Sequence, residues 1–180
     1  KSLGNFTTIR ALLQSGLSAM ALRLFVLQAH YRKPLDFTPA ALDAATTGWK
    51  GLSAALSWGE DRAAAVGWGD HTALRVEAVS AGLSANGPFE ELEQRFIAAM
   101  DDDLTSSGAL AVLFDLARPL RGLANRLDRG DQPEQPADEL RQLQSRWMLL
   151  RELAAVLGLR SETDEAQASE NRGIDDQAIE

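Results

Sequence analysis

The first residues of the chain carry the clearest candidate for chemistry, a lysine at the start of a short loop. Lys1 and Ser2 precede Gly4, which gives the loop conformational freedom. The lysine ammonium is a compact cation on a flexible stem, and a cation placed where negative charge develops stabilises a transition state. Such an ammonium is suited to meet charge that develops on a triphosphate as pyrophosphate departs, but a lysine at this position does not by itself establish that role.

Three consecutive aspartates, Asp101 to Asp103, are the next residues that could bind a ligand. A calcium loop spaces its ligands alternately around a glycine, whereas these carboxylates are adjacent. Because Thr105 to Ser107 follow them, we interpret the run as a corner that caps the next helix. The sequence predicts no metal site, and the absence of cysteine excludes disulfides and thiolate ligands within the chain.

The remaining titratable candidates are two histidines and one arginine. His30 and His71 have no cluster of partner residues nearby in the sequence, so we assign both a structural role. Arg23 is the only charge in the apolar stretch 19–27. Two interpretations of Arg23 stay open: a fixed contact to a catalytic domain or to RNA, or a packed stem whose head reaches water.

Charge is distributed unevenly along the chain. The 180 residues carry a net charge of -8, which argues against a general nucleic-acid binder, yet residues 1–33 hold five cations and no acid. The basic first segment can face phosphates while the acidic remainder keeps the protein in solution. A hydrophobic content of 45% suffices for a core. No stretch resembles a membrane span or signal segment, and we expect a cytoplasmic location.

Hydrophobic periodicity predicts an all-α fold. Helices are expected over residues 8–15, 18–31, 38–57, 89–101, 108–127 and 140–157, with a further candidate over 72–81. The predicted caps are Thr7 or Thr8 for the first helix, Ser18 for the second and Thr38 for the third, and Pro119 should kink its helix. Residues 35–37 are expected to be extended. Together the helices predict an antiparallel bundle, followed by an acidic flexible linker after residue 160.

Several stretches resemble one family in order and spacing. Lys1-Ser2-Leu3-Gly4-Asn5-Phe6 is similar to the end of the lysine-methionine-serine-lysine-serine loop of class I aminoacyl-tRNA synthetases. Residues 19–23, 30–37, 100–103 and 109–115 add to the likeness, and 19–23 is similar to the Asp-Ala-Leu-Arg helix of that class. Over 1–57 and 88–158 the chain resembles cysteinyl-tRNA synthetase.

The resemblance implies a division of the chain and a role for each part. Residues 1–37 would be the end of the ATP-binding loop and a stem-contact segment, 38–158 a tRNA-binding helical bundle, and 159–180 a linker. Lys1 would be catalytic and would bind ATP together with Ser2. The residues expected to contact a cysteine-specific tRNA are Arg10, Arg23, Arg32 and Lys33.

The same resemblance implies the chemistry of the whole enzyme. It would join L-cysteine to tRNA through an adenylate made from ATP, with zinc ligands outside this chain, and we expect a monomer. The chain alone would be inactive, because it lacks the amino-acid pocket. Two alternatives stay open: a cysteine ligase of mycothiol synthesis from the same superfamily, and a helical interaction module without catalysis. The mycothiol ligase has no need of a tRNA-facing bundle or an anticodon domain, and residues 175–180, which resemble the entry to such a domain, favour the synthetase. The interaction module would make the opening motif accidental.

Overall fold

The structure is a computed structural model that describes residues 8–62, 68, 89–130 and 137–161. These residues form helices and no strand, which confirms the all-α prediction for the described part of the chain. The helices are α1 (Ile9–Gln14), α2 (Ala19–Leu27), α3 (Pro39–Arg62), α5 (Glu90–Asp101), α6 (Ser106–Asp128) and α7 (Ala137–Val156). None of them is long and apolar enough to pass through a bilayer.

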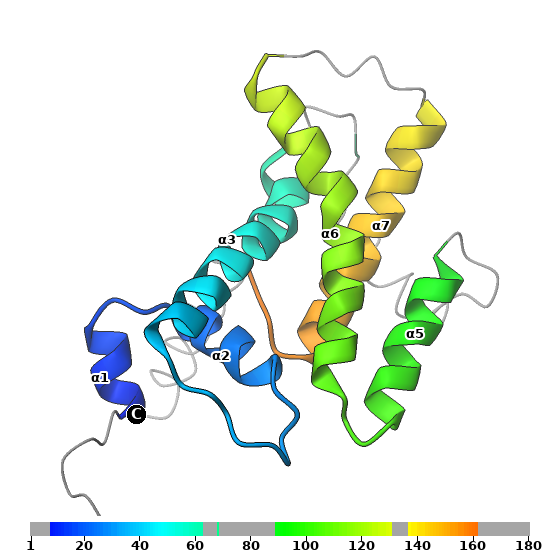
Figure 1. The fold of residues 1–180 in the computed structure, drawn as a ribbon. Coiled ribbons are helices and arrows are strands. Elements are labelled where there is room, and N and C mark those ends of the chain that lie inside the picture. Colours follow the sequence, from blue (N-terminus) through cyan, green and yellow to red (C-terminus); the bar gives the residue numbers. More distant parts are fainter. Residues whose placement is uncertain (1–7, 63–67, 69–88, 131–136, 162–180) are drawn as a thin grey trace, which may run out of the picture.

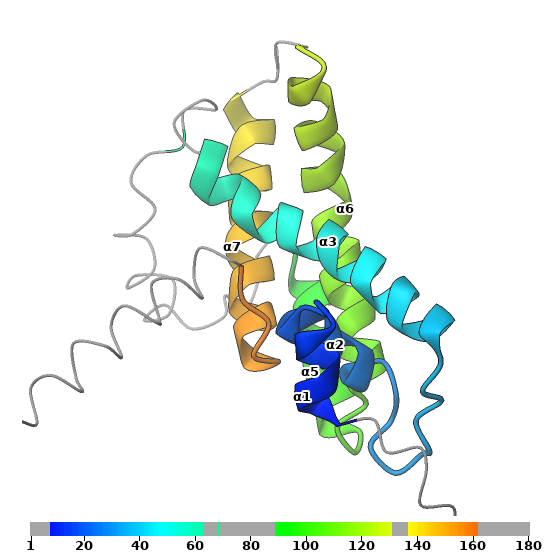
Figure 2. The same cartoon turned by 90° about the vertical axis from the view of Figure 1, so that its left-hand side faces the viewer.

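Helix α6 lies at the centre of the bundle. Helices α5 and α7 run antiparallel to it on one side, and α3 packs against both α6 and α7 (Figure 1). Seen from the side, α3 crosses α6 and α7 obliquely (Figure 2). Helix α2 packs mainly on α3, near the end of α3 where that helix begins. The antiparallel bundle is therefore formed by the long helices, with α1 and α2 attached at one end.

A tryptophan on α7 occupies the middle of the core. Trp147 is almost completely buried, and its indole Nε1 donates a hydrogen bond of 2.8 Å to the carbonyl of Leu56 on α3. Trp68 lies between Trp147 and Trp58, with ring centroids 5.9 Å and 5.0 Å away. A Cβ atom added at Gly59 would overlap the Trp147 indole. Helices α3 and α7 thus approach closely because a glycine faces the ring.

The predicted starts of the first helices are confirmed. The hydroxyl oxygens of Thr8, Ser18 and Thr38 accept hydrogen bonds from backbone N–H groups three residues further on, at 3.1, 3.4 and 3.2 Å. These bonds satisfy N–H groups that have no partner inside the helix. Helix α3 runs five residues beyond the predicted end at 57, to Arg62.

Helix α2 ends at Leu27, four residues before the predicted end at Tyr31. The Ser106 hydroxyl donates a hydrogen bond of 2.8 Å to the Leu27 carbonyl, and so satisfies a terminal acceptor from outside the helix. The Arg32 backbone N–H is bonded to Nδ1 of His30, which belongs to a turn. Contacts with the bundle, which the local pattern does not contain, therefore stop the helix early.

The later helices follow the predicted pattern closely. Helix α6 continues through Pro119, whose ring is exposed, and α7 ends where Gly158 adopts a φ of +65°. Residues 35–37 pair with no strand in the described part of the chain, and Phe37 packs its ring edge-on against Phe25 at 5.5 Å. The candidate helix over 72–81 and residues 162–180 of the predicted linker lie outside the described residues. Leu159 and Ser161, at the start of that linker, are buried, so the packed part of the chain extends beyond the predicted boundary at 158.

Candidate functional site

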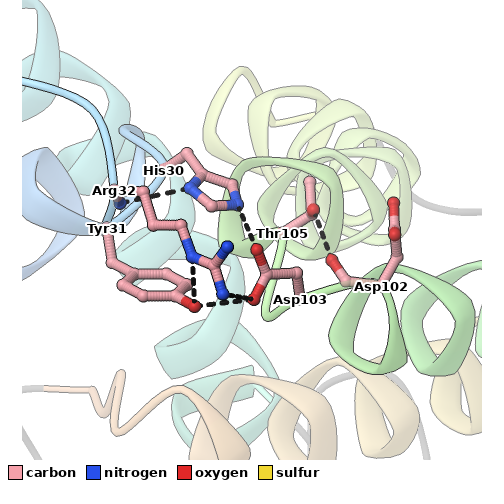
Figure 3. Close-up of polar contacts among 6 residues, drawn as sticks. All are labelled: His30, Tyr31, Arg32, Asp102, Asp103 and Thr105. Atoms are coloured by element: carbon pink, nitrogen blue, oxygen red, sulfur yellow. Dashed lines mark hydrogen bonds and ion pairs between the residues drawn. The ribbon is translucent and has the colours of Figure 1, made fainter.

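A cluster of polar side chains joins the segment after α2 to the corner between α5 and α6. His30, Tyr31 and Arg32 come from the segment 28–37, and Asp103 comes from the corner (Figure 3). The two parts are about seventy positions apart in the sequence. All four side chains point toward one another in Figure 3, so one carboxylate meets three neighbours from another segment.

The two carboxylate oxygens of Asp103 divide these partners between them. The phenol of Tyr31 donates a hydrogen bond of 2.6 Å to Oδ1, and Nη2 of Arg32 donates to the same oxygen at 3.1 Å. Nε of Arg32 also donates to the Tyr31 oxygen at 2.8 Å, which closes a triangle. Nε2 of His30 lies 3.6 Å from Oδ2, within reach of an ion pair when the imidazole is protonated.

The cluster is at the surface. The hydrogen bond to the Asp103 carboxylate raises the pKa of the Tyr31 phenol, which Arg32 opposes by donating to the phenol oxygen. The imidazole of His30 stacks on the Tyr31 ring, with centroids 4.9 Å apart. Because the side chains of Arg32 and Asp103 are 67% and 42% exposed, water screens their attraction. The cluster is therefore suited to orienting side chains more than to stabilising the fold.

The backbone of the corner is strained. Asp103 and Leu104 have φ angles of +52° and +54°, a left-handed conformation that residues other than glycine rarely adopt. The Thr105 hydroxyl donates to the Asp102 carbonyl at 2.7 Å, and the backbone N–H of Thr105 bonds to the Ala99 carbonyl at 2.9 Å. These hydrogen bonds stabilise the turn, and the turn directs the Asp103 side chain outward, toward Arg32.

The predicted capping role of the aspartate run is wrong. The N-cap residue of α6 is Thr105, and its side chain makes no capping hydrogen bond. Asp103 instead binds residues of the segment 28–37, and its partners could not be deduced from the local pattern. Sequence reasoning named Asp103 only as part of a capping corner and Tyr31 only as part of the stretch 30–37, so it missed the contact between them. The only local signal was the placement of aspartate and cations in two short polar stretches.

Arg23 makes a second contact between distant segments. A Cβ atom added at Gly158 would overlap the Arg23 guanidinium, so the arginine head lies against the end of α7. Carbonyl groups at a helix C-terminus carry partial negative charge, which favours a cation there. Arg23 is also exposed, which agrees with the interpretation of a packed stem whose head reaches water; the contact with the end of α7 was in neither interpretation.

The other predicted site residues are distributed over the first third of the chain. Lys1 and Ser2 lie outside the described residues. Arg10 on α1 and Lys33 after α2 are exposed and make no side-chain ion pair within the described part of the chain. The structure therefore brings Arg32 together with Asp103, and leaves Arg10 and Lys33 accessible to a ligand.

The described residues contain no group of three or more His, Cys, Asp or Glu side chains that could hold a metal ion. The chain also has no cysteine to supply thiolate ligands. The zinc that the family resemblance implies does not fit these residues, so no step of the chemistry is assigned to it.

Two family models match the chain in order. The first 47 residues match the catalytic domain of class I (C) tRNA synthetases, and residues 95–161 match a DALR domain. The first match includes α1, α2 and the segment 28–37, and the second includes most of α5 and all of α6 and α7. The stretch 19–23, which resembles the Asp-Ala-Leu-Arg helix, falls in the catalytic match and not in the DALR match. The matches define the class of protein as a class I aminoacyl-tRNA synthetase.

The curated relatives indicate which family within this class the chain resembles. A cysteine–tRNA ligase of Synechococcus sp. (strain CC9902) is 67% identical over 91% of the chain and 33% of its own length. Those of Synechococcus sp. (strain WH7803) and Prochlorococcus marinus (strain MIT 9303) are 66% and 56% identical over the whole chain and 36% of their own length. The chain belongs to the cysteinyl-tRNA synthetase family. It spans about a third of the length of the curated relatives it matches.

Proposed function

We propose that this chain works as part of a cysteine–tRNA ligase. The observation that carries the proposal is the continuous match, at 66% identity over the whole chain, to a relative named for that activity. The two family models add support, because an end of a catalytic domain and a DALR domain occur in the expected order. The DALR match also favours the ligase over the two alternatives, neither of which needs a bundle that faces tRNA.

The proposed reaction has two steps. The carboxylate of cysteine attacks the α-phosphorus of ATP, which gives cysteinyl-adenylate and pyrophosphate. A hydroxyl of the terminal ribose of tRNA then attacks the cysteinyl carbonyl and releases AMP. Lys1 and Ser2 would contact ATP in the first step, and the Lys1 ammonium would stabilise charge on the departing pyrophosphate.

The basic residues of the first segment would serve the tRNA. Arg10, Arg23, Arg32 and Lys33 lie on α1, on α2 and in the segment that follows, with no acid among residues 1–33. Phosphate contacts by such cations supply affinity without reading sequence. The net charge of -8 over the chain limits this affinity and confines it to the basic end.

The proposal is tested in an enzyme of the relatives' length that contains this sequence. Cysteine-dependent exchange of pyrophosphate into ATP and cysteinylation of tRNA should both be measurable, with serine as the control amino acid. Exchange that is absent with cysteine, or equal with serine, would overturn the proposed function. The 180-residue chain by itself should give only background exchange.

A further inference from the structure

We propose that Asp103 is a positioning residue that holds the segment 28–37 in one orientation and so presents Arg32 and Lys33 to the tRNA. The inference rests on the proposed function for its ligand. The inference assigns a role to the Asp103 carboxylate, which takes no part in the proposed formation of the adenylate from ATP.

The segment 28–37 has few other restraints. It connects α2 to α3 without regular structure, and Tyr31, Leu35 and Phe37 are all exposed by more than a third. The edge-on contact of Phe37 with Phe25 secures its end near α3. At the opposite end, the Ser106 hydroxyl holds the Leu27 carbonyl. Between these two points, the polar contacts with Asp103 tie the segment to the bundle (Figure 3).

This link fixes the direction of the Arg32 guanidinium. Nε donates to the Tyr31 phenol and Nη2 donates to Asp103, so two sides of the planar group are held. The third nitrogen, Nη1, has no hydrogen-bond partner among the described residues. A planar guanidinium held on two sides can donate its remaining N–H groups to a phosphate oxygen without losing further freedom.

The left-handed backbone at the corner costs conformational free energy, and a carboxylate that only faced water would not need this backbone. Leu104 is 57% exposed, so burial does not offset its left-handed backbone. Strained conformations persist where the surroundings over-determine them, and they concentrate at functional sites. The turn at Asp103 and Leu104 is what brings the carboxylate to Tyr31 and Arg32. The link also joins the catalytic match to the DALR match, so it can transmit the position of one to the other.

The first test measures orientation without activity. Because the chain has no cysteine, Asp36→Cys and Asn125→Cys, both at exposed positions, allow spin labels on the segment and on α6. Pulsed electron resonance should show one narrow distance distribution. Asp103→Asn, which suits a left-handed backbone, should broaden it, as should Tyr31→Phe to a smaller degree.

Asp102→Asn is the matched control, since it removes the same charge from the neighbouring residue, whose side chain makes no hydrogen bond or ion pair with the described residues. The distribution should stay narrow in this variant. Equal widths in Asp103→Asn and Asp102→Asn would overturn the inference, whatever the enzyme does.

The second test separates the two half-reactions in the full-length enzyme. Asp103→Asn should lower kcat/KM for tRNA in cysteinylation on the order of tenfold, within the usual range for coupling between sites. Cysteine-dependent pyrophosphate exchange should remain at the wild-type rate. A parallel fall in both steps would indicate a structural defect and contradict the positioning role. If the wild-type enzyme lacks both activities, the proposed function fails, while the distance measurement still decides whether Asp103 orders the segment.

Discussion

At the scale of single residues, Lys1 is expected to dominate the first half-reaction. Its ammonium would meet charge that appears on the phosphates only as pyrophosphate departs, so it contributes more to the transition state than to the ground state. Lys1→Ala should lower the rate constant of adenylate formation by about 100- to 1000-fold, with little change in cysteine binding. Single-turnover adenylation in the full-length enzyme measures both.

Two further variants make the Lys1 prediction specific. Lys50→Ala removes an exposed lysine of α3 and should leave the rate constant unchanged. Lys1→Arg should restore only part of the rate, because a planar guanidinium does not replace a compact ammonium. A Lys1→Ala enzyme as fast as wild type would show that this lysine does not act on ATP.

A second residue-scale prediction concerns Glu93 on α5. Its side chain is only 7% exposed, and burial, with a smaller contribution from Glu90, raises the pKa of its carboxyl. A raised pKa in the folded state means that the folded protein binds the proton more tightly than the unfolded chain does. The charge therefore destabilises the fold at neutral pH, and this cost disappears as the pH falls through the raised pKa.

Removal of the Glu93 charge should reveal this cost. Glu93→Gln should stabilise the chain by about 1–2 kcal/mol at pH 7, and the gain should shrink as the pH falls through the raised pKa. Thermal unfolding across this pH range measures the gain. Glu91→Gln is the control, since Glu91 shares the first turn of α5 but is exposed. A gain independent of pH, or equal in the control, would contradict the assignment.

The predictability of individual residues depended on the range of their contacts. The caps Ser18 and Thr38 were predicted correctly, and Thr8 was one of two candidates, because each bonds to a backbone N–H three residues away. The role of Asp103 was missed because its partners lie about seventy positions away. A local sequence pattern contains contacts between residues three positions apart, and it does not contain contacts between distant segments.

At the scale of helices, the contact between α3 and α7 depends on Trp147. Trp147→Ala would leave a cavity at the centre of the core and the Leu56 carbonyl without its donor, so it should destabilise the chain by about 3–5 kcal/mol. Chemical denaturation followed by circular dichroism measures the loss. A midpoint equal to wild type would show that the described packing is wrong.

A pair of glycine substitutions tests the same contact from the other helix. In Gly59→Ala the new methyl group would overlap the Trp147 indole, and overpacking should cost about 1–3 kcal/mol. The matched control is Gly122→Ala on α6, where nothing lies within 4 Å of the added Cβ. There the helix propensity of alanine should stabilise the chain by about 0.5–1 kcal/mol. A lower unfolding midpoint than wild type for Gly59→Ala and a higher one for Gly122→Ala would confirm the packing. Shifts in the same direction for both variants would refute it.

Helix existence was more predictable than helix length. The apolar spacing of α7 continues from Leu140 to Leu157, and the helix was predicted with nearly its observed bounds. Helix α2 was predicted too long, since Ser106 binds the carbonyl of its last residue, Leu27, and Asp103 binds Tyr31, at the end of the predicted continuation. Periodicity reports which face a helix buries, whereas its end depends on what lies beside it in space.

At the scale of the whole molecule, the distribution of charge predicts where the proposed tRNA partner would bind. The five cations of residues 1–33 contrast with a net charge of -13 over the rest of the chain. Within the described residues, α1, α2 and the segment 28–37 lie at the opposite end of the bundle from the end of α6 (Figure 1). A polyanion should therefore approach the basic end and be repelled elsewhere.

Binding of tRNA to the chain should accordingly be weak and strongly dependent on salt. Each phosphate contact releases counterions, so the slope of log K against log salt concentration measures how many contacts form. The double variant Arg10→Gln and Lys33→Gln should reduce the magnitude of that slope by about two, because each cation that binds a phosphate contributes about one unit. Arg126→Gln, which removes an exposed cation from the last turn of α6, should leave the slope unchanged. Titration of labelled tRNA at several salt concentrations gives the three slopes. Equal slopes for the double variant and wild type, or tight binding that salt does not weaken, would place the RNA surface elsewhere on the molecule.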